Sequence, residues 1–337
     1  MLEDMGVEVV EERPYELHPP GNGPVWIHDF GVTYTGPEGD VDVSRVRDVF
    51  QDAFAAILRG EAESDGFNRL VLRARLTWRQ IVVLRAYCKY LRQTRMTFSQ
   101  EYMEQAMANN PGIARWLVEL FQGRFDPTQP DGGQGRVEEL RERLATSIDQ
   151  VANLDEDRIL RSFLGMVEAS LRTNFYQAGE GGRPKPYLSL KFDPTQVPSL
   201  PKPRPMFEVF VYSPRTEAVH LRGGKVARGG IRWSDRREDF RTEILGLLKA
   251  QMVKNAVIVP VGAKGGFVVK QPPAEGGREA LMDEVVACYS TMMRGLLDIT
   301  DNRVDGKVVP PADVVRYDDD DPYLVVAADK GTATFSD

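Results

Sequence analysis

Apolar residues recur at helical spacing through most of residues 37–180 of this 337-residue chain. Over Arg45–Arg59 they follow the i, i+3, i+4, i+7 pattern of a helix that buries one face. Ser44 is the expected N-cap, with Asp42 as the alternative, and Gly60 is placed to end the helix. The same period predicts further helices over Thr77–Thr94, Ser99–Asn109, Pro111–Gln122, Arg136–Ala152 and Glu156–Asn174. These patterns predict a helical domain.

A strand-like pattern precedes the helical part. Val7–Arg13 and Val25–Thr33 are rich in β-formers, and the sequence HPPGNG at His18–Gly23 lies between them. Two such runs around a Pro/Gly turn predict a β-hairpin. A lone hairpin is too small to be stable by itself, so we expect residues 1–36 to be the end of a larger domain.

The rest of the chain alternates strand-length and helix-length patterns. Residues 178–186, rich in Gly, Pro and Lys, mark a boundary after the helical part. Beyond it the predicted strands are Tyr187–Phe192, Met206–Tyr212, Glu217–Leu221, Asn255–Val259 and Tyr323–Ala328, and the predicted helices are Arg236–Ala250 and Arg278–Ile299. We therefore expect an α+β or α/β fold, with a hairpin, a helical domain and, over residues 181–337, an α/β domain with a mixed sheet.

Composition narrows the functional classes. The net charge is −7 and the sequence pI is near 5.3, which argues against a general nucleic-acid or membrane-surface binder. Two cysteines and three histidines lie far apart with no metal-ligand spacing, so no metal is expected and a reduced, cytoplasmic setting is the default. No signal peptide or membrane-spanning run is evident. The acidic run Asp318–Asp321 is expected to be a solvated loop.

The candidate chemistry lies in Arg222–Lys270, where three glycine pairs stand beside cationic side chains. Glycine allows sharp turns and close approach of the backbone to a ligand, and lysine and arginine bind carboxylates or phosphates. Asp235 and Glu238 resemble a capping box at the start of the helix between the RGGIRW and PVGAKGG turns. This arrangement indicates a pocket for a small anion, although glycines that only form turns and lysines that are only surface charges remain the alternative.

Three cations of this segment, Arg228, Lys254 and Lys264, are expected to surround one small volume. Their mutual repulsion favours a bound carboxylate and also favours the neutral form of the lysine that water reaches least. A lysine of this kind can transfer protons near neutral pH. Lys264 is therefore the candidate acid–base group.

The motifs RGGIRW, KAQMVKNA and PVGAKGG resemble the substrate-binding core of the glutamate dehydrogenase family. The last motif is one glycine shorter than the family pattern, and Arg228 stands where the family usually has lysine. These departures, together with the helical part before them, are more similar to the large NAD-specific enzymes than to the small hexameric ones. The N-terminal hairpin resembles the end of the small α/β regulatory domain of the large enzymes.

The resemblance implies a role for each matching residue. Arg228 in the Gly229–Gly230 motif would bind the distal carboxylate of glutamate. Lys254, helped by Gln251, would bind the α-carboxylate.

Two residues would carry the chemistry that the resemblance implies. Lys264 would activate water for attack on the imine carbon, and an aspartate would move a proton to the amine. Asp329, in VVAADKGTA, is favoured for the second role because an apolar run precedes it and a glycine follows it. Asp313, in VVPPADVV, is the second choice because that stretch has the prolines.

The family also implies partners and a cofactor. The substrates would be glutamate, 2-oxoglutarate and ammonia, the cofactor NAD, and the full-length protein a homo-oligomer. No strand–GxGxxG–helix unit is found here, so NAD would be bound mainly by a domain that this chain lacks, and the chain alone is expected to be inactive. A regulatory or oligomerisation module and another amino-acid dehydrogenase are the alternatives.

Overall fold

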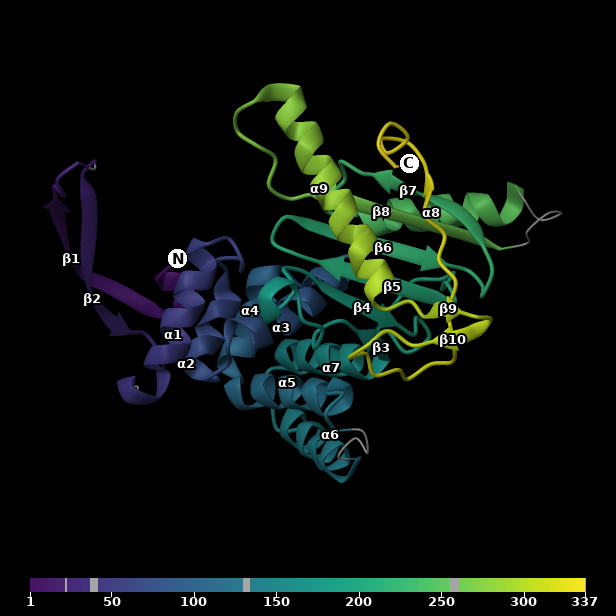
Figure 1. Cartoon of the computed structure of the whole chain (residues 1–337). Helices are drawn as coiled ribbons and strands as arrows, with labels where there is room; N and C mark the ends of the chain where they lie inside the picture. The colour runs from purple at the N-terminus through teal and green to yellow at the C-terminus, as the bar shows by residue number, and fades with distance from the viewer. Residues whose placement is uncertain (22, 37–41, 130–133, 255–260, 337) are drawn as a thin grey trace.

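The computed structural model describes residues 1–21, 23–36, 42–129, 134–254 and 261–336, but not the side chains of residue 134 and residues 252–254. The chain begins with the hairpin β1 (Val7–Leu17) and β2 (Val25–Tyr34), which pair antiparallel as predicted. Among the described residues, seven α-helices follow: α1 (Val43–Leu58), α2 (Leu70–Arg73), α3 (Trp78–Arg92), α4 (Gln100–Asn109), α5 (Pro111–Phe125), α6 (Gln134–Ile148) and α7 (Leu154–Ala169). Figure 1 shows the hairpin extending away from the helices.

The sheet has seven strands in the part of the chain that is described. Its order is β11 (Ala327–Ala328), β7 (Arg228–Trp233), β8 (Gly262–Val269), β6 (Thr216–Arg222), β5 (Phe207–Tyr212), β4 (Leu188–Phe192) and β3 (Ser170–Thr173). The pairs β11–β7 and β7–β8 are parallel and the other pairs are antiparallel. The predicted fold class, α+β or α/β with a mixed sheet, is thereby confirmed. A small hairpin, β9 (Asn302–Val304) with β10 (Lys307–Val309), follows the last helix.

Helices cover the two faces of this sheet. Helix α9 (Gly277–Asp298) crosses one face (Figure 1). Its Met292 and Tyr289 pack with Phe267 of β8. Helix α8 (Phe240–Lys254) covers part of the other face, and helices α3 to α7 share one continuous core with it. Lys264 of β8 lies on this second face.

Several local expectations are wrong. The N-cap of α1 is the alternative, Asp42, rather than Ser44; the Asp42 side chain accepts a hydrogen bond from the backbone N–H of Ser44. Helix α7 ends at Ala169, because Ser170–Thr173 leaves the helix to pair with β4 as strand β3. Helix α8 begins at Phe240 rather than Arg236, after a turn in which the Ser234 hydroxyl accepts from the N–H of Arg236.

Two further corrections concern strands. RGGIRW is the strand β7, and AKGG lies inside β8, where turns were expected. Within Tyr323–Ala328, only Ala327–Ala328 form a strand, and both residues are exposed at the edge of the sheet. The predicted strand Asn255–Val259 lies outside the described residues.

Candidate functional site

The glycines of the motif allow strand backbones to approach closely. A Cβ atom added at Gly229 would overlap the carbonyl oxygen of Ala263 on β8. A Cβ added at Gly230 would lie 2.9 Å from the carbonyl oxygen of Ala327 on β11. A side chain at either position would push the neighbouring strand away, so glycine is required here by close packing rather than by a turn.

Strand β7 brings Lys264 and Asp329 together. In the register of the sheet, Gly230 stands opposite Lys264 on one side and Ala327 on the other, and Asp329 follows β11 directly. The Nζ of Lys264 donates a hydrogen bond to Oδ2 of Asp329. Gly230 has no side chain to separate them. The lysine side chain is 6% exposed and the aspartate 30%, so the ammonium group is buried while its partner keeps access to solvent.

The surroundings of Asp329 stabilise its charged form. Burial by itself raises the pKa of this carboxyl, but the hydrogen bond and charge of Lys264 and the other interactions named next together outweigh it, so the pKa lies below its usual value. A backbone N–H and the nearby charge of Arg232 act in the same direction. The backbone N–H of Asp329 donates to the Thr332 hydroxyl, which in turn donates to the carbonyl of Ile231, and these bonds fix the turn.

One face of β7 and β8 carries Arg228, Gly230 and Lys264 of the predicted site, whereas Gly229 belongs to the opposite face. Side chains two apart on a strand point the same way, so Arg228 and Gly230 of β7 share a face with their partners Gly262 and Lys264 of β8. This is the face that α8 covers, because a Cβ at Gly262 would lie 2.8 Å from the Cβ of Gln251. Arg228, Gly230, Gly262 and Lys264 therefore all lie on the α8 side of the sheet.

The other two cations of the predicted site are Arg228 and Lys254, and only the side chain of Arg228 is among the described residues. Arg228 is exposed at the start of β7, and no ion pair is found for it among the described residues. Lys254 ends helix α8, but its side chain lies outside the described residues. The convergence of three cations on one volume therefore stays a prediction, whereas the pairing of Lys264 with Asp329 is observed.

Helix α8 is fixed to the sheet by buried charge. Arg241 of α8 donates to both carboxylate oxygens of Glu208 on β5, at 2.5 and 2.7 Å, and both side chains are fully buried. Near the site, Arg232 forms an ion pair with Glu243 of α8 at 3.1 Å. Arg232 was missed by the sequence analysis. The alternation of a strand from Gly230 to Arg232 would have placed it on the site face, had RGGIRW been interpreted as β7.

The acidic run Asp318–Asp321 is only half solvated: Asp319 and Asp320 are exposed as expected, whereas Asp318 and Asp321 are largely buried in ion pairs. Asp318 pairs with Arg172 and Lys191 at 2.6 Å, and Asp321 pairs with Lys191 at 2.7 Å and with Arg222. Burial alone raises the pKa of Asp321, but these cations lower it below its usual value. The run was misinterpreted because sequence does not reveal which strand residues face it.

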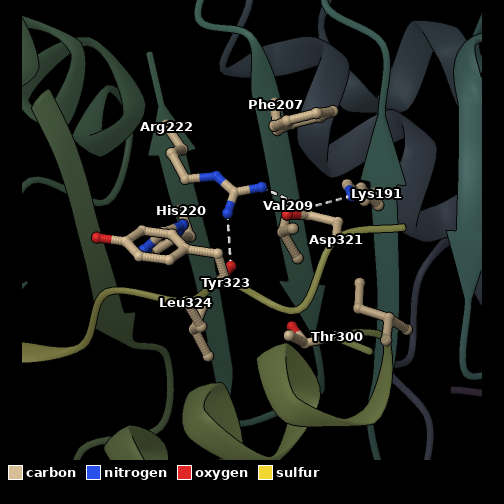
Figure 2. Close-up of a pocket in the computed structure, with 10 residues that line it drawn as sticks. Lys191, Phe207, Val209, His220, Arg222, Thr300, Asp321, Tyr323 and Leu324 are labelled. Atoms are coloured by element: carbon tan, nitrogen blue, oxygen red, sulfur yellow. Dashed lines mark hydrogen bonds and ion pairs between the residues drawn. The ribbon is translucent and has the colours of Figure 1, made fainter. Parts of the chain in front are cut away.

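Figure 2 shows how this network holds the chain that leads to Asp329. The Arg222 guanidinium points to Asp321 and donates to the carbonyl of Tyr323 at 2.5 Å. His220 Nε2 lies 2.9 Å from the carbonyl oxygen of Val325. The cavity among these side chains is about 20 Å³, room for roughly one water molecule. The network therefore tethers the segment that leads to Asp329, and the small cavity within it is not a substrate pocket.

Asp313, the second choice for the catalytic carboxylate, lies elsewhere. It is exposed in a turn with a φ of 55°, and Lys264 pairs with Asp329 instead. Within the described residues, no group of three or more His, Cys, Asp or Glu side chains could hold a metal ion. In the same part of the chain, no helix has the length and apolar character that crossing a membrane requires.

Comparison with known protein families gives three matches along the chain. The model of "Bacterial NAD-glutamate dehydrogenase, catalytic domain" matches residues 143–337. "Glutamate dehydrogenase, helical motif 3" matches residues 62–127, and "Glutamate dehydrogenase, ACT3 domain" matches residues 1–46.

Curated relatives are similar over the whole chain. NAD-specific glutamate dehydrogenases of Halomonas elongata and Pseudomonas aeruginosa are each 54% identical over all of it, and that of Mycobacterium tuberculosis is 52% identical. The chain spans 21% of the length of the first two relatives and 22% of the third.

Proposed function

Because this chain belongs to the family of bacterial NAD-glutamate dehydrogenases, we propose that it supplies the substrate-binding and acid–base part of an enzyme that oxidises L-glutamate to 2-oxoglutarate and ammonia. The observation that carries the proposal is the buried ion pair of Lys264 with Asp329, on the face of β7 that also bears Arg228. Such a cluster suits a small dicarboxylate.

The proposed roles follow from what each group can do. Once the amine has been oxidised to an imine, water must add to the imine carbon and ammonia must leave. Lys264 first passes a proton to Asp329, with which it is in contact; the neutral amine then takes a proton from the attacking water, while Asp329 delivers its proton to the departing amine. Lys264 is then again an ammonium group and Asp329 again a carboxylate, so both groups end in their starting states.

Substrate binding is assigned to the cations around this pair. Arg228 binds the distal carboxylate, and Lys254 with Gln251 binds the α-carboxylate. The Gly229–Gly230 pair supports binding indirectly, because it lets β8 and β11 approach β7 closely enough for Lys264 and Asp329 to meet. An arginine at position 228 argues against an amino-acid dehydrogenase with a neutral side-chain pocket, because such a substrate gives the guanidinium no partner.

NAD is the proposed hydride acceptor of the whole enzyme. In the described residues no strand leads through a GxGxxG turn into a helix, so we assign no residue of this chain to the cofactor. We place NAD binding in the part of the relatives' length that this chain does not span. The 337-residue chain alone is accordingly expected not to oxidise glutamate.

The proposed organisation is an N-terminal regulatory piece (1–36), a helical domain (37–180) and the substrate domain (181–337) of a cytoplasmic homo-oligomer. A second function, regulation or subunit contact, is proposed for the hairpin alone. It is favoured by large apolar side chains that the hairpin exposes, such as Trp26 at 55% and Ile27 at 50%. Charge substitutions there should change assembly or regulation without changing glutamate binding.

Binding of 2-oxoglutarate tests the substrate assignment. Calorimetric titration into wild type and Arg228→Gln should show an affinity about 10- to 100-fold lower in the variant, because one charge-assisted contact is lost. Lys225→Gln is the matched control, since this exposed cation lies near the motif and carries no proposed role. Equal affinities in wild type and Arg228→Gln would remove the dicarboxylate assignment.

A further inference from the structure

A second cavity, of about 730 Å³, lies between the helices and the sheet, away from the Lys264–Asp329 pair. It is bounded by the first turns of α3, by residues 179–187 and by the β5–β6 turn at Ser213 and Pro214. Its volume is in the range of pockets that bind small molecules. Its lining includes Gly179 and Glu180 of the glycine-rich segment 179–182, which has the sequence GEGG and has no role in the proposed function.

Arg79 of α3 is a half-buried cation in the wall of this cavity. Its Nε and Nη2 atoms are inaccessible to solvent and have no hydrogen-bond partner, and no ion pair is found for it in the described part of the chain. Its guanidinium lies over the ring of Phe175, 5.0 Å from the ring centroid. Burial lowers the pKa of Arg79 to about 10, so the group is still charged at neutral pH. A buried charge without a counter-ion is costly, which makes this arginine a candidate ligand contact.

The charge balance of the cavity is positive. Two lining cations are neutralised within the protein: Arg59 by Glu61 at 3.0 Å, and Lys185 by Asp298 at 2.6 Å. Three lining arginines have no ion pair among the described residues: Arg79, Arg183 and Arg294. Of the lining carboxylates in the described part of the chain, only Glu180 also has no ion pair. This balance favours an anion.

The walls also offer flat apolar surface. Trp78 and Tyr187 line the cavity beside the arginines. Aromatic rings next to guanidinium groups suit a ligand that carries its charge on a planar or apolar body. Because Trp78 and Arg79 belong to the first turn of the 15-residue helix α3, the positive end of the helix dipole adds to the attraction.

We propose that this cavity binds a small organic anion, bearing carboxylate or phosphate groups on a planar or apolar body, with Arg79 as its principal counter-ion. The site is separate from the proposed catalytic pair. Lys270, which follows β8, donates to the carbonyl of Ser213 in the cavity wall at 3.0 Å. Lys264 lies six residues earlier on the same extended chain, about 20 Å away. The ligand is therefore an effector rather than the substrate.

The first test measures stability without any ligand. If Arg79 is kept for binding, Arg79→Met removes an unpaired buried charge while keeping an apolar contact with Phe175, so the melting temperature of the 337-residue chain should stay equal or rise. If Arg79 has only a structural role, the same change should lower the melting temperature by several degrees, and that result would overturn the proposal. Arg47→Gln, at an exposed arginine of α1, controls for the change in net charge.

The second test adds probes that distinguish the two anion chemistries. Citrate supplies carboxylates, and AMP supplies a phosphate on a planar body. We expect at least one of them to raise the melting temperature of wild type and Arg47→Gln by about 2 °C or more, with no rise in Arg79→Met. Arg79→Lys, which keeps the charge but loses the planar fork, should lower the affinity at least tenfold.

Each outcome decides the question. Stabilisation by citrate alone assigns a carboxylate ligand, and stabilisation by AMP alone assigns a phosphate ligand. Equal stabilisation of wild type and Arg79→Met would mean that the probe binds elsewhere, and no stabilisation by either probe would mean that the cavity does not select anions. Either of the last two results refutes the proposed site. In a positive case, Trp78 fluorescence should change with the same affinity as the melting temperature.

Discussion

Replacing Arg222 with Met tests how the segment that carries Asp329 is held. Arg222 is 4% exposed and pairs with Asp321, which keeps a second cation, Lys191, at 2.7 Å. Removing one partner of a buried ion pair costs about 3–5 kcal/mol, because the other charge stays buried without compensation. Since Lys191 still compensates Asp321 in part, we expect the lower end, about 3 kcal/mol.

Urea unfolding of the 337-residue chain measures this loss. With a slope of about 3 kcal/mol/M, the midpoint should fall by roughly 1 M. Lys225→Met is the matched control, because Lys225 pairs with Asp319 at 3.6 Å and the two side chains are 65% and 90% exposed. That exposed pair is expected to contribute less than about 0.5 kcal/mol.

The same variant should affect catalysis in the full-length protein. Arg222 also donates to the carbonyl of Tyr323, on the chain that leads to Asp329, so its loss should reduce kcat more than it changes KM. If Arg222→Met shifts the urea midpoint no more than Lys225→Met does, the acidic run is solvated and the tether is not what positions Asp329.

Two more predictions follow from close packing and buried charge. Gly229→Ala should destabilise the chain by about 2–3 kcal/mol in urea unfolding, since its methyl group would overlap the Ala263 carbonyl, whereas Gly246→Ala, with no atom within 4 Å, should be neutral or slightly stabilising. Burial raises the pKa of Glu63, but the charge of Lys270 and other cations lowers it from 4.5 to about 2. Its stabilisation is therefore present above pH 4.5 and is lost as the pH falls towards 2. About 2 kcal/mol of a total of roughly 3 kcal/mol is lost between pH 6 and pH 3, so Glu63→Gln should remove this dependence from unfolding curves measured over that range. Unchanged pH dependence in Glu63→Gln would contradict the second prediction.

The helices were predictable because their signals are local. The helices predicted over Thr77–Thr94 and Ser99–Asn109 form as α3 and α4, with Thr77 capping α3 through a capping box with Gln80 and Ser99 capping α4. Apolar spacing of 3.6 residues reports one buried face, which the helix keeps whatever it packs against. The errors at Asp42 and at the start of α8 concern which of several neighbouring polar side chains caps the helix, and small differences in hydrogen bonding decide that.

The glycine motif was misjudged because its glycines serve contacts between distant strands. Gly229 and Gly230 look like turn residues in sequence, yet each is required by a carbonyl that belongs to another strand. The sequence contains no local sign of the register that sets Gly230 between Lys264 and Ala327. Resemblance to a family supplied both Lys264 and Asp329, whereas spacing alone supplied only the lysine.

The buried network around Asp321 could not be predicted from the local sequence either, because its partners also come from distant strands. Lys191, Arg222 and Arg172 come from three strands, and only the fold brings them to one acidic run. A charge run in sequence is the same whether it meets water or cations. Its environment depends on sheet order, which the pattern of strands leaves open.

The most direct measurement of the central claim is kcat for glutamate oxidation by the full-length protein carrying Asp329→Asn, compared with Asp313→Asn. Loss of a positioned proton carrier should lower kcat about 10²- to 10⁴-fold in Asp329→Asn, while Asp313→Asn should keep wild-type turnover. Adding Lys264→Met to Asp329→Asn should cost little more, because the two side chains act as one unit. Wild-type kcat in Asp329→Asn, with the loss appearing in Asp313→Asn instead, would contradict the account.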